Sequence, residues 1–112
     1  MRELVDLLKV IADESRLKII FALEKRNSCV CELASFLNLT QPTISSHLKQ
    51  LRQSGIVDYK KDGKWVEYFL TENTPIRDLI AQLKLLIPGM NDLDNEINRI
   101  YSIHRNNLDK KC

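Results

Sequence analysis

The chain has 112 residues, of which 44% are hydrophobic and 29% charged, and its net charge is +2. This length suits one domain, and the composition is that of a soluble globular protein. No apolar run approaches the roughly 18 residues of a membrane span, and the acidic N-terminal stretch is not typical of a signal peptide. Three cysteines indicate no disulfide framework, so we expect thiols in a reducing, cytoplasmic compartment.

Basic residues are concentrated in the middle of the chain. Residues 40–65 carry five basic and two acidic side chains, whereas the segments on either side are close to neutral. Such a cluster is typical of a phosphate-binding face, although short charge runs are most often solvated surface.

Apolar spacing predicts three helices in the first part of the chain. Residues 2–12 have hydrophobic side chains at intervals of three and four, as an amphipathic helix requires. A second helix is expected to begin at Asp13 or Glu14 and to end near residues 25–27, where basic side chains favour a C-terminus. A short third helix is predicted over residues 32–37.

The next segment predicts a longer helix that follows a tight turn. Thr40 suits an N-cap, and Pro42 suits the first helical turn, where a missing N–H costs nothing. The helix is expected over residues 41–53, and Gly55 suits the position that ends it. Its buried side is expected to consist of Ile44, Leu48 and Leu51.

Two β-prone runs, residues 57–61 and 64–70, are separated by Asp62-Gly63. Asp-Gly between such runs is a strong signal for a hairpin with these two residues in the turn. The lysines on either side of the turn then lie at the hairpin tip.

Two further helices are predicted in the C-terminal part. Apolar side chains from residue 76 to residue 87 recur at helical spacing, and Pro88-Gly89 is expected to end this helix. A similar apolar stripe, which includes His104, predicts a last helix over residues 91–108.

The order of these elements is that of a winged helix–turn–helix, a mainly α fold with a β-hairpin. We assign residues 1–112 to a single domain, with the helix–turn–helix at 32–54 and the wing at 57–70. Residues 1–12 and 76–108 carry apolar stripes beyond the needs of one winged domain. We expect them to pair two subunits, because a two-fold dimer is the commonest solution for such surfaces.

The exposed side of the helix at 41–53 has the composition of a surface that lies in the major groove of double-stranded DNA. Hydroxyl and amide side chains read base edges, mostly from the N-terminal part of such a helix, while Lys and Arg hold phosphates. A polar, solvated helix face is the alternative, and His47 at its border either contacts phosphate or completes the packing. The candidate DNA-binding residues are Gln41, Thr43, Ser45, Ser46, His47, Lys49, Gln50, Arg52, Lys61 and Lys64.

Three segments carry a resemblance to a known family: ADESRLKIIFAL, VCELASFLNLTQPTISSHLKQLRQSGIV and KKDGKWVEYFL. Together they resemble the ArsR/SmtB metalloregulatory repressors, in particular the arsenic-responsive members, over roughly residues 4–72. The resemblance implies a homodimeric repressor of operator DNA, with no enzyme activity and no permanent cofactor. It also implies that As(III) or Sb(III) is the inducer that releases the repressor from DNA.

The arsenic site of the family corresponds to Cys29 and Cys31, while Ala34 stands where the enterobacterial type has a third cysteine. Thiolates suit thiophilic ions, and Cys112 is a candidate third ligand. Residues two apart diverge on a helix and lie about 6.6 Å apart along a strand. We therefore expect the backbone to turn at Cys31, the predicted N-cap, and a ligand there to tilt the helix that reads DNA.

Other interpretations of the cysteines remain open at this point: buried apolar side chains, a thiol-redox switch, or a response to cadmium, lead or zinc. No cysteine precedes Cys29, as the cadmium and lead sites of relatives require, and His104 has no second histidine at a useful spacing for zinc. A protein-interaction module with structural cysteines is the alternative from another class. No Ser/His/Asp constellation, carboxylate dyad or phosphate loop indicates an enzyme.

Overall fold

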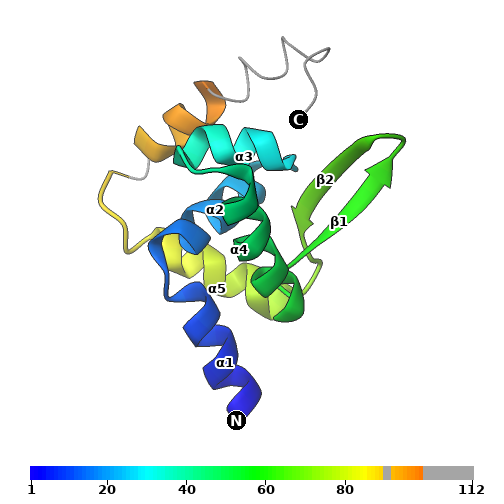
Figure 1. Cartoon of the computed structure of the whole chain (residues 1–112). Coiled ribbons are helices and arrows are strands. Elements are labelled where there is room, and N and C mark those ends of the chain that lie inside the picture. The colour runs from blue at the N-terminus through cyan, green and yellow to red at the C-terminus, as the bar shows by residue number, and fades with distance from the viewer. Residues whose placement is uncertain (90–91, 100–112) are drawn as a thin grey trace.

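The computed structural model describes residues 1–89 and 92–99, and its architecture is a winged helix–turn–helix, as the sequence predicts (Figure 1). Within these residues, no helix has the length and apolar character to cross a membrane. His104 and Cys112 lie outside the described residues. The elements are α1 (Arg2–Ile11), α2 (Glu14–Lys25), α3 (Val30–Leu37), α4 (Gln41–Gln53), β1 (Val57–Asp62), β2 (Trp65–Leu70) and α5 (Thr74–Lys84), followed by a helical segment at 92–99.

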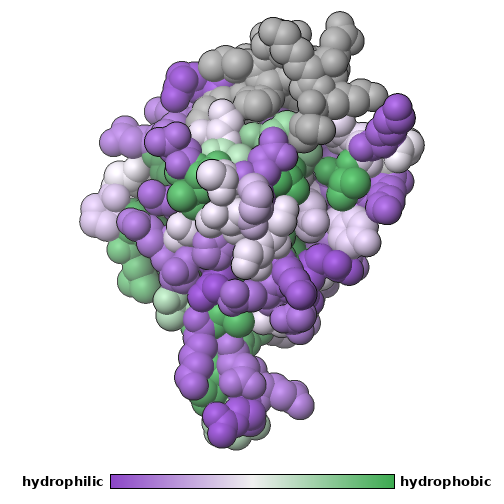
Figure 2. All heavy atoms as spheres, in the orientation of Figure 1, coloured by the Kyte–Doolittle hydropathy of each residue, from purple (hydrophilic) through white to green (hydrophobic). Residues whose placement is uncertain are grey.

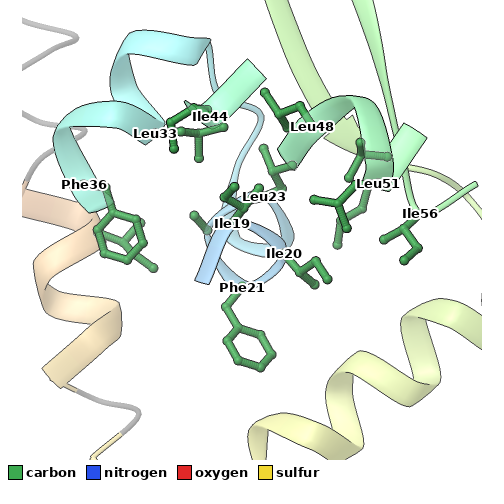
Figure 3. Close-up of a cluster of buried hydrophobic side chains, with 14 of the residues drawn as sticks. Ile19, Ile20, Phe21, Leu23, Leu33, Phe36, Ile44, Leu48, Leu51 and Ile56 are labelled. Atoms are coloured by element: carbon green, nitrogen blue, oxygen red, sulfur yellow. The ribbon is translucent and has the colours of Figure 1, made fainter. Parts of the chain in front are cut away.

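The helix α2 lies at the centre of the fold, in contact with α1, α3, α4, α5 and β2. It begins where predicted, because the Asp13 side chain accepts a hydrogen bond from the backbone N–H of Arg16 at 3.0 Å. Its residues 19–23 are all buried. Figure 3 shows Ile19 directed towards α3 and α4, whereas Phe21 points to another side of α2. A helix with apolar side chains all round is expected at such a central position.

A tight turn joins α3 to α4. Asn38 adopts the left-handed conformation with φ 57° and ψ 46°, and the Leu39 N–H donates to the Ala34 carbonyl at 3.1 Å. Asn and Gly are the residues that most often end a helix in this way. The turn places Leu33 beside Ile44, both fully buried, so that the two helices share one core (Figure 3).

The C-terminal end of α4 is built from two backbone hydrogen bonds. The Gly55 N–H donates to the Arg52 carbonyl and the Ile56 N–H to the Leu51 carbonyl, each at 3.0 Å. Gly55 has a φ of 78°, which costs little without a Cβ atom. Leu51 and Ile56 are both buried, so the end of α4 is fixed against the core before β1 begins.

The hairpin has its turn one residue later than predicted. Asp62 pairs with Trp65, which leaves Gly63 and Lys64 as the two-residue loop instead of Asp62-Gly63. The strand register sets this loop, and the φ of 64° at Gly63 suits its first place. Lys64 therefore lies in the loop itself.

The helix α5 ends at Lys84, so the prediction that it continues to Ile87 is wrong. The N–H groups of Leu85 and Ile87 donate to carbonyls three residues earlier, Gln82 at 3.1 Å and Lys84 at 3.3 Å. Such bonds tighten a helix end, and the position before Pro88 disfavours helical backbone.

Candidate functional site

Cys29 and Cys31 lie at the N-terminal end of α3. Cys29 is the N-cap, with an extended backbone (φ −89°, ψ 168°) and 3% exposure, and Cys31 is half-buried in the first turn. Their Sγ atoms are 3.7 Å apart. Two thiolates about 2.3 Å from one shared atom, at a tetrahedral angle, lie about 3.8 Å apart. The two sulfurs are therefore placed to ligate one atom with little change of backbone.

The prediction that Cys31 is the N-cap is wrong, and Glu32 is the reason. Its Oε1 accepts a hydrogen bond from the Cys29 N–H at 3.0 Å, and its own N–H is directed at the Cys29 sulfur. This is a capping box, in which the side chain three residues after the N-cap bonds back to it. The extended N-cap followed by a helical turn brings the sulfurs together, which a regular helix or strand does not do.

The surroundings of the dithiol favour the protonated form of Cys29. Burial raises the pKa of the Cys29 thiol to about 11, and the negative charge of Glu32, itself only 1% exposed, adds to the rise. At neutral pH Cys29 is therefore a thiol, and any ligand that binds its sulfur must replace a proton.

The dithiol does not belong to a larger set of metal ligands in the described part of the chain. No group of three or more His, Cys, Asp or Glu side chains there could hold a metal ion. Structural zinc sites use four protein ligands.

The residue before the dithiol is joined to the wing. Ser28 and Tyr68 exchange two backbone hydrogen bonds, of 3.0 and 2.8 Å. The Tyr68 ring lies 5.5 Å from the Tyr59 ring, and the Arg52 guanidinium lies 4.3 Å above Tyr59. A continuous set of contacts therefore runs from the dithiol through the hairpin to the end of α4. These contacts could not be predicted from the sequence, because no local pattern marks a pairing between residues so far apart.

The predicted DNA-binding residues of α4 share one face of the helix. The core residues Ile44, Leu48 and Leu51 occupy the opposite face with no exposed surface, and His47 is half-buried between the two faces. Figure 2 shows a white to purple, polar surface over α4. The exposed candidates are Gln41, Thr43, Ser45, Ser46, Lys49, Gln50 and Arg52 on α4, Lys61 on β1 and Lys64 in the hairpin loop.

Three of these candidates have side-chain partners within the chain: Gln50, Arg52 and Thr43, whose hydroxyl lies 2.9 Å from that of Thr40. Arg16 of α2 donates to the Gln50 side-chain oxygen at 2.6 Å and also to the carbonyl of Val10, so it connects α1 and α2 to α4. Arg52 lies 3.5 Å from the Asp58 carboxylate. Both contacts hold exposed side chains in place at the C-terminal half of α4. The role of Arg16 depends on long-range packing and was not predicted from the sequence.

A groove of about 230 Å³ has Cys29 and three of the DNA-binding candidates in its walls. Its walls come from the start of α3, the N-terminal half of α4 and the hairpin. The lining residues are Cys29, Val30, Gln41, Ser45, Lys64, Trp65 and Val66.

This geometry defines a class of protein, a winged helix–turn–helix domain in which α4 exposes a polar face and α3 begins at two cysteines. The family model "Bacterial regulatory protein, arsR family" matches residues 13–59. The chain is 32% identical over 85 residues to the arsenical resistance operon repressor of Staphylococcus aureus, a match that covers 76% of this chain and 81% of that protein. The chain belongs to the arsR family of bacterial regulatory proteins.

Two further relatives are similar to the chain. The arsenical resistance operon repressor of Escherichia coli K12 is 44% identical over 72 residues, which cover 63% of this chain and 62% of the relative, less than two thirds of its length. The structure of reduced HlyU from Vibrio cholerae has 38% identity and a TM-score of 0.70, and the match covers 76% of this chain and 88% of that one. These relatives of the chain are regulators, not enzymes.

Proposed function

We propose that this protein is a transcriptional repressor that binds operator DNA as a homodimer and leaves it when As(III) or Sb(III) binds Cys29 and Cys31. The observation that supports this proposal most strongly is the 3.7 Å separation of the two sulfurs. They lie at a helix start that contacts both the reading helix and the wing.

The chemistry of the trivalent hydroxides suits this site. Arsenous acid is neutral near pH 7. Each thiol displaces one hydroxide, so that an As–S bond forms, and the thiol proton combines with the displaced hydroxide as a water molecule. The raised pKa of Cys29 is therefore no obstacle. The product adds no net charge next to the buried Glu32, whereas a divalent cation requires both thiols to ionise.

The DNA-binding role rests on the exposed face of α4. In helix–turn–helix proteins the second helix lies in the major groove, and its N-terminal residues contact base edges. Here those residues are Gln41, Thr43, Ser45 and Ser46, which suit hydrogen bonding to bases. Lys49 and the hairpin lysines suit contacts with phosphates.

The dimer rests on apolar surface that the described residues leave exposed. Leu4 and Leu8 of α1 are 52% and 45% exposed, and Leu85 and Leu86 after α5 are 79% and 76% exposed. Figure 1 shows α1 projecting from the body of the fold. Since large apolar patches mark contact surfaces, we assign α1 and the segment from α5 onward to the subunit interface.

A ligand at the dithiol has two routes to DNA. One is the packing of Leu33 against Ile44, which joins α3 to α4. The other is the backbone pairing of Ser28 with Tyr68, which joins the dithiol to the wing. A dimer reads two half-sites at a fixed spacing, so a small tilt in each subunit weakens binding.

An oxidant response through a direct bond between Cys29 and Cys31 has less support from this geometry. A bond between Cys29 and Cys31 requires the sulfurs to move from 3.7 Å to about 2.05 Å within a very small ring. A thiol with a raised pKa also reacts slowly, because the thiolate is the nucleophile.

The test is a titration of a labelled operator complex with arsenite, followed by fluorescence anisotropy. We expect DNA affinity to fall by about 5- to 150-fold, the range of a typical coupling between two sites. The Cys29→Ser/Cys31→Ser variant should bind DNA and ignore arsenite, and Cys112→Ser tests the candidate third ligand. Normal release from the double variant would place the inducer site elsewhere.

A further inference from the structure

The helices α1 and α4 are held together by little apolar packing. None of the side chains of α1 is fully buried, and Figure 1 shows this helix projecting from the body of the fold. A cleft of about 660 Å³ lies between Glu3 and Asp6 of α1 and Gln50 and Gln53 in the C-terminal half of α4. Since few buried contacts cross this junction, packing alone fixes the angle between the two helices only weakly.

The guanidinium group of Arg16 supplies a polar connection at this junction. Its Nε donates to the carbonyl of Val10 in the last turn of α1, and its Nη1 donates to the side-chain oxygen of Gln50 at 2.6 Å. The last four carbonyls of a helix have no partner within that helix, and a positive charge beside them is favourable. One rigid, planar group therefore holds the end of α1 at a fixed place against α4.

The backbone of Arg16 is itself fixed. Its N–H donates to the Asp13 carboxylate at 3.0 Å, in the bond that caps α2. The helix α2 is the central element of the fold and has residues 19–23 buried. The connection between α1 and α4 therefore has its base in the best packed part of the molecule.

On the basis of the proposed function, we propose that Arg16 is a positioning residue that sets the distance between the two reading helices of the dimer. Gln50 then serves this contact and reads no base. The helix α1 belongs to the proposed subunit interface and α4 to the proposed DNA surface. The angle between them in each subunit therefore determines where the two α4 helices lie. Because a dimer reads half-sites at a fixed separation, the Arg16 contact selects operators by their half-site spacing.

The cost of a wrong spacing follows from this contact. One inserted base pair moves a half-site by about 3.4 Å along the DNA and rotates it by about 35°. To follow the half-site, α4 must turn relative to α1, which breaks the bond between Arg16 and Gln50. A chain without this bond adapts with no such loss, so it discriminates less between spacings.

The experiment uses labelled duplexes selected from random DNA by the full wild-type chain. The same duplexes are also made with one base pair inserted or removed between the half-sites. Fluorescence anisotropy gives the ratio of the affinities for the selected and the altered spacing, at concentrations where sedimentation shows a dimer. We expect a wild-type ratio of about 5- to 150-fold, the range of a typical coupling between two sites. Arg16→Met should lower this ratio by about 2- to 12-fold for each bond that has to break, the equivalent of one hydrogen bond.

Two variants of the exposed Gln50 separate this contact from effects on folding. Gln50→Ala removes the acceptor and should lower the ratio as Arg16→Met does, and the double variant should lower it no further. Gln50→Glu keeps an acceptor oxygen, so it should keep the wild-type ratio, although its charge weakens binding to every duplex. A base contact from Gln50 would instead affect both spacings alike and leave the ratio unchanged in Gln50→Ala.

The outcomes distinguish the positioning role from DNA binding itself. A wild-type ratio of one, or a wild-type ratio that persists in Gln50→Ala, overturns the positioning role and leaves the proposed repressor intact. Loss of the dimer in Gln50→Ala also overturns it, because the contact would then serve assembly. Failure of the wild-type chain to select any duplex overturns the proposed function.

Discussion

The N-terminal ends of α3 and α4 both line one groove, but they differ in burial and in the groups that cap them. The start of α3 is buried, with Cys29 as the N-cap and the Glu32 carboxylate bonded back to it. The start of α4 is exposed, and the Thr40 hydroxyl bonds to the Thr43 hydroxyl, not to the helix backbone. One start is closed by the protein's own groups, and the other leaves its polar groups for an external partner.

The difference indicates a division of labour within one motif. A ligand at the start of α3 binds sulfurs of a capped helix start, and any shift of α3 reaches α4 through the packing of Leu33 against Ile44. A ligand at the start of α4 meets a preformed exposed surface. The groove lined by Cys29, Gln41 and Ser45 is where the two starts meet.

The largest expected effect concerns the proton on the buried thiol. The pKa of Cys29 is raised to about 11, so the thiol stays protonated below that pH and loses its proton when a divalent cation binds. Cadmium affinity should therefore rise about tenfold per pH unit from this proton alone, or about 100-fold between pH 6 and 8. The affinity for arsenite should change little with pH, because the thiol proton leaves as part of a water molecule and no free proton is released.

Competition with a chelator at several pH values measures the cadmium slope, and dialysis measures arsenite. Cys29→Ser should lower the cadmium slope by one proton. An arsenite affinity that rises with pH as steeply as that of cadmium would contradict the condensation chemistry.

The next effect is on operator binding, when a base-contacting side chain at the exposed start of α4 is removed. Gln41→Ala should weaken binding to the operator by about 5- to 150-fold while leaving non-specific DNA binding nearly unchanged. Lys49→Ala should weaken binding to all DNA sequences alike and reduce the slope of log affinity against log salt by about one. Anisotropy titrations on operator and scrambled DNA at several salt concentrations distinguish the two, and equal effects of both variants on both DNAs would argue against a reading face.

The smallest effects are expected from the two caps. Glu32→Ala should lower the free energy of unfolding by about 1–2 kcal/mol, because it removes the acceptor of the Cys29 N–H. Thr40→Ala should cost only a few tenths of a kcal/mol, since its hydroxyl bonds to a side chain. Urea unfolding gives both values, and Glu32→Gln, which keeps an acceptor oxygen, is the control. Equal losses of unfolding free energy in Glu32→Ala and Thr40→Ala would contradict the difference in capping between α3 and α4.

Local signals in the sequence were enough to predict the helices around the core. Asp13 before α2 and Gly55 after α4 act within four residues of themselves, through a side-chain cap and a left-handed helix end. The exposed and buried faces of α4 follow from the helical period. The resemblance to the family, read from the same segments, is confirmed.

The errors arose where a signal was ambiguous or lay far away in the chain. The capping signature was present, since Glu32 follows Cys29 by three residues, but the helix was predicted to begin at Glu32, which puts the N-cap at Cys31. Gly63 fits either place in a two-residue loop, so only the strand register decides. The Arg16–Gln50 bond and the Ser28–Tyr68 pairing depend on tertiary packing and have no local pattern.

The central claim is that Cys29 and Cys31 hold the arsenic atom, and arsenic X-ray absorption spectroscopy tests it most directly. With one equivalent of arsenite and a small thiol, the wild-type chain should show arsenic bonded to sulfur only. The Cys29→Ser/Cys31→Ser variant should retain no protein-bound arsenic with that signature. An unchanged sulfur shell in the double variant would contradict the claim.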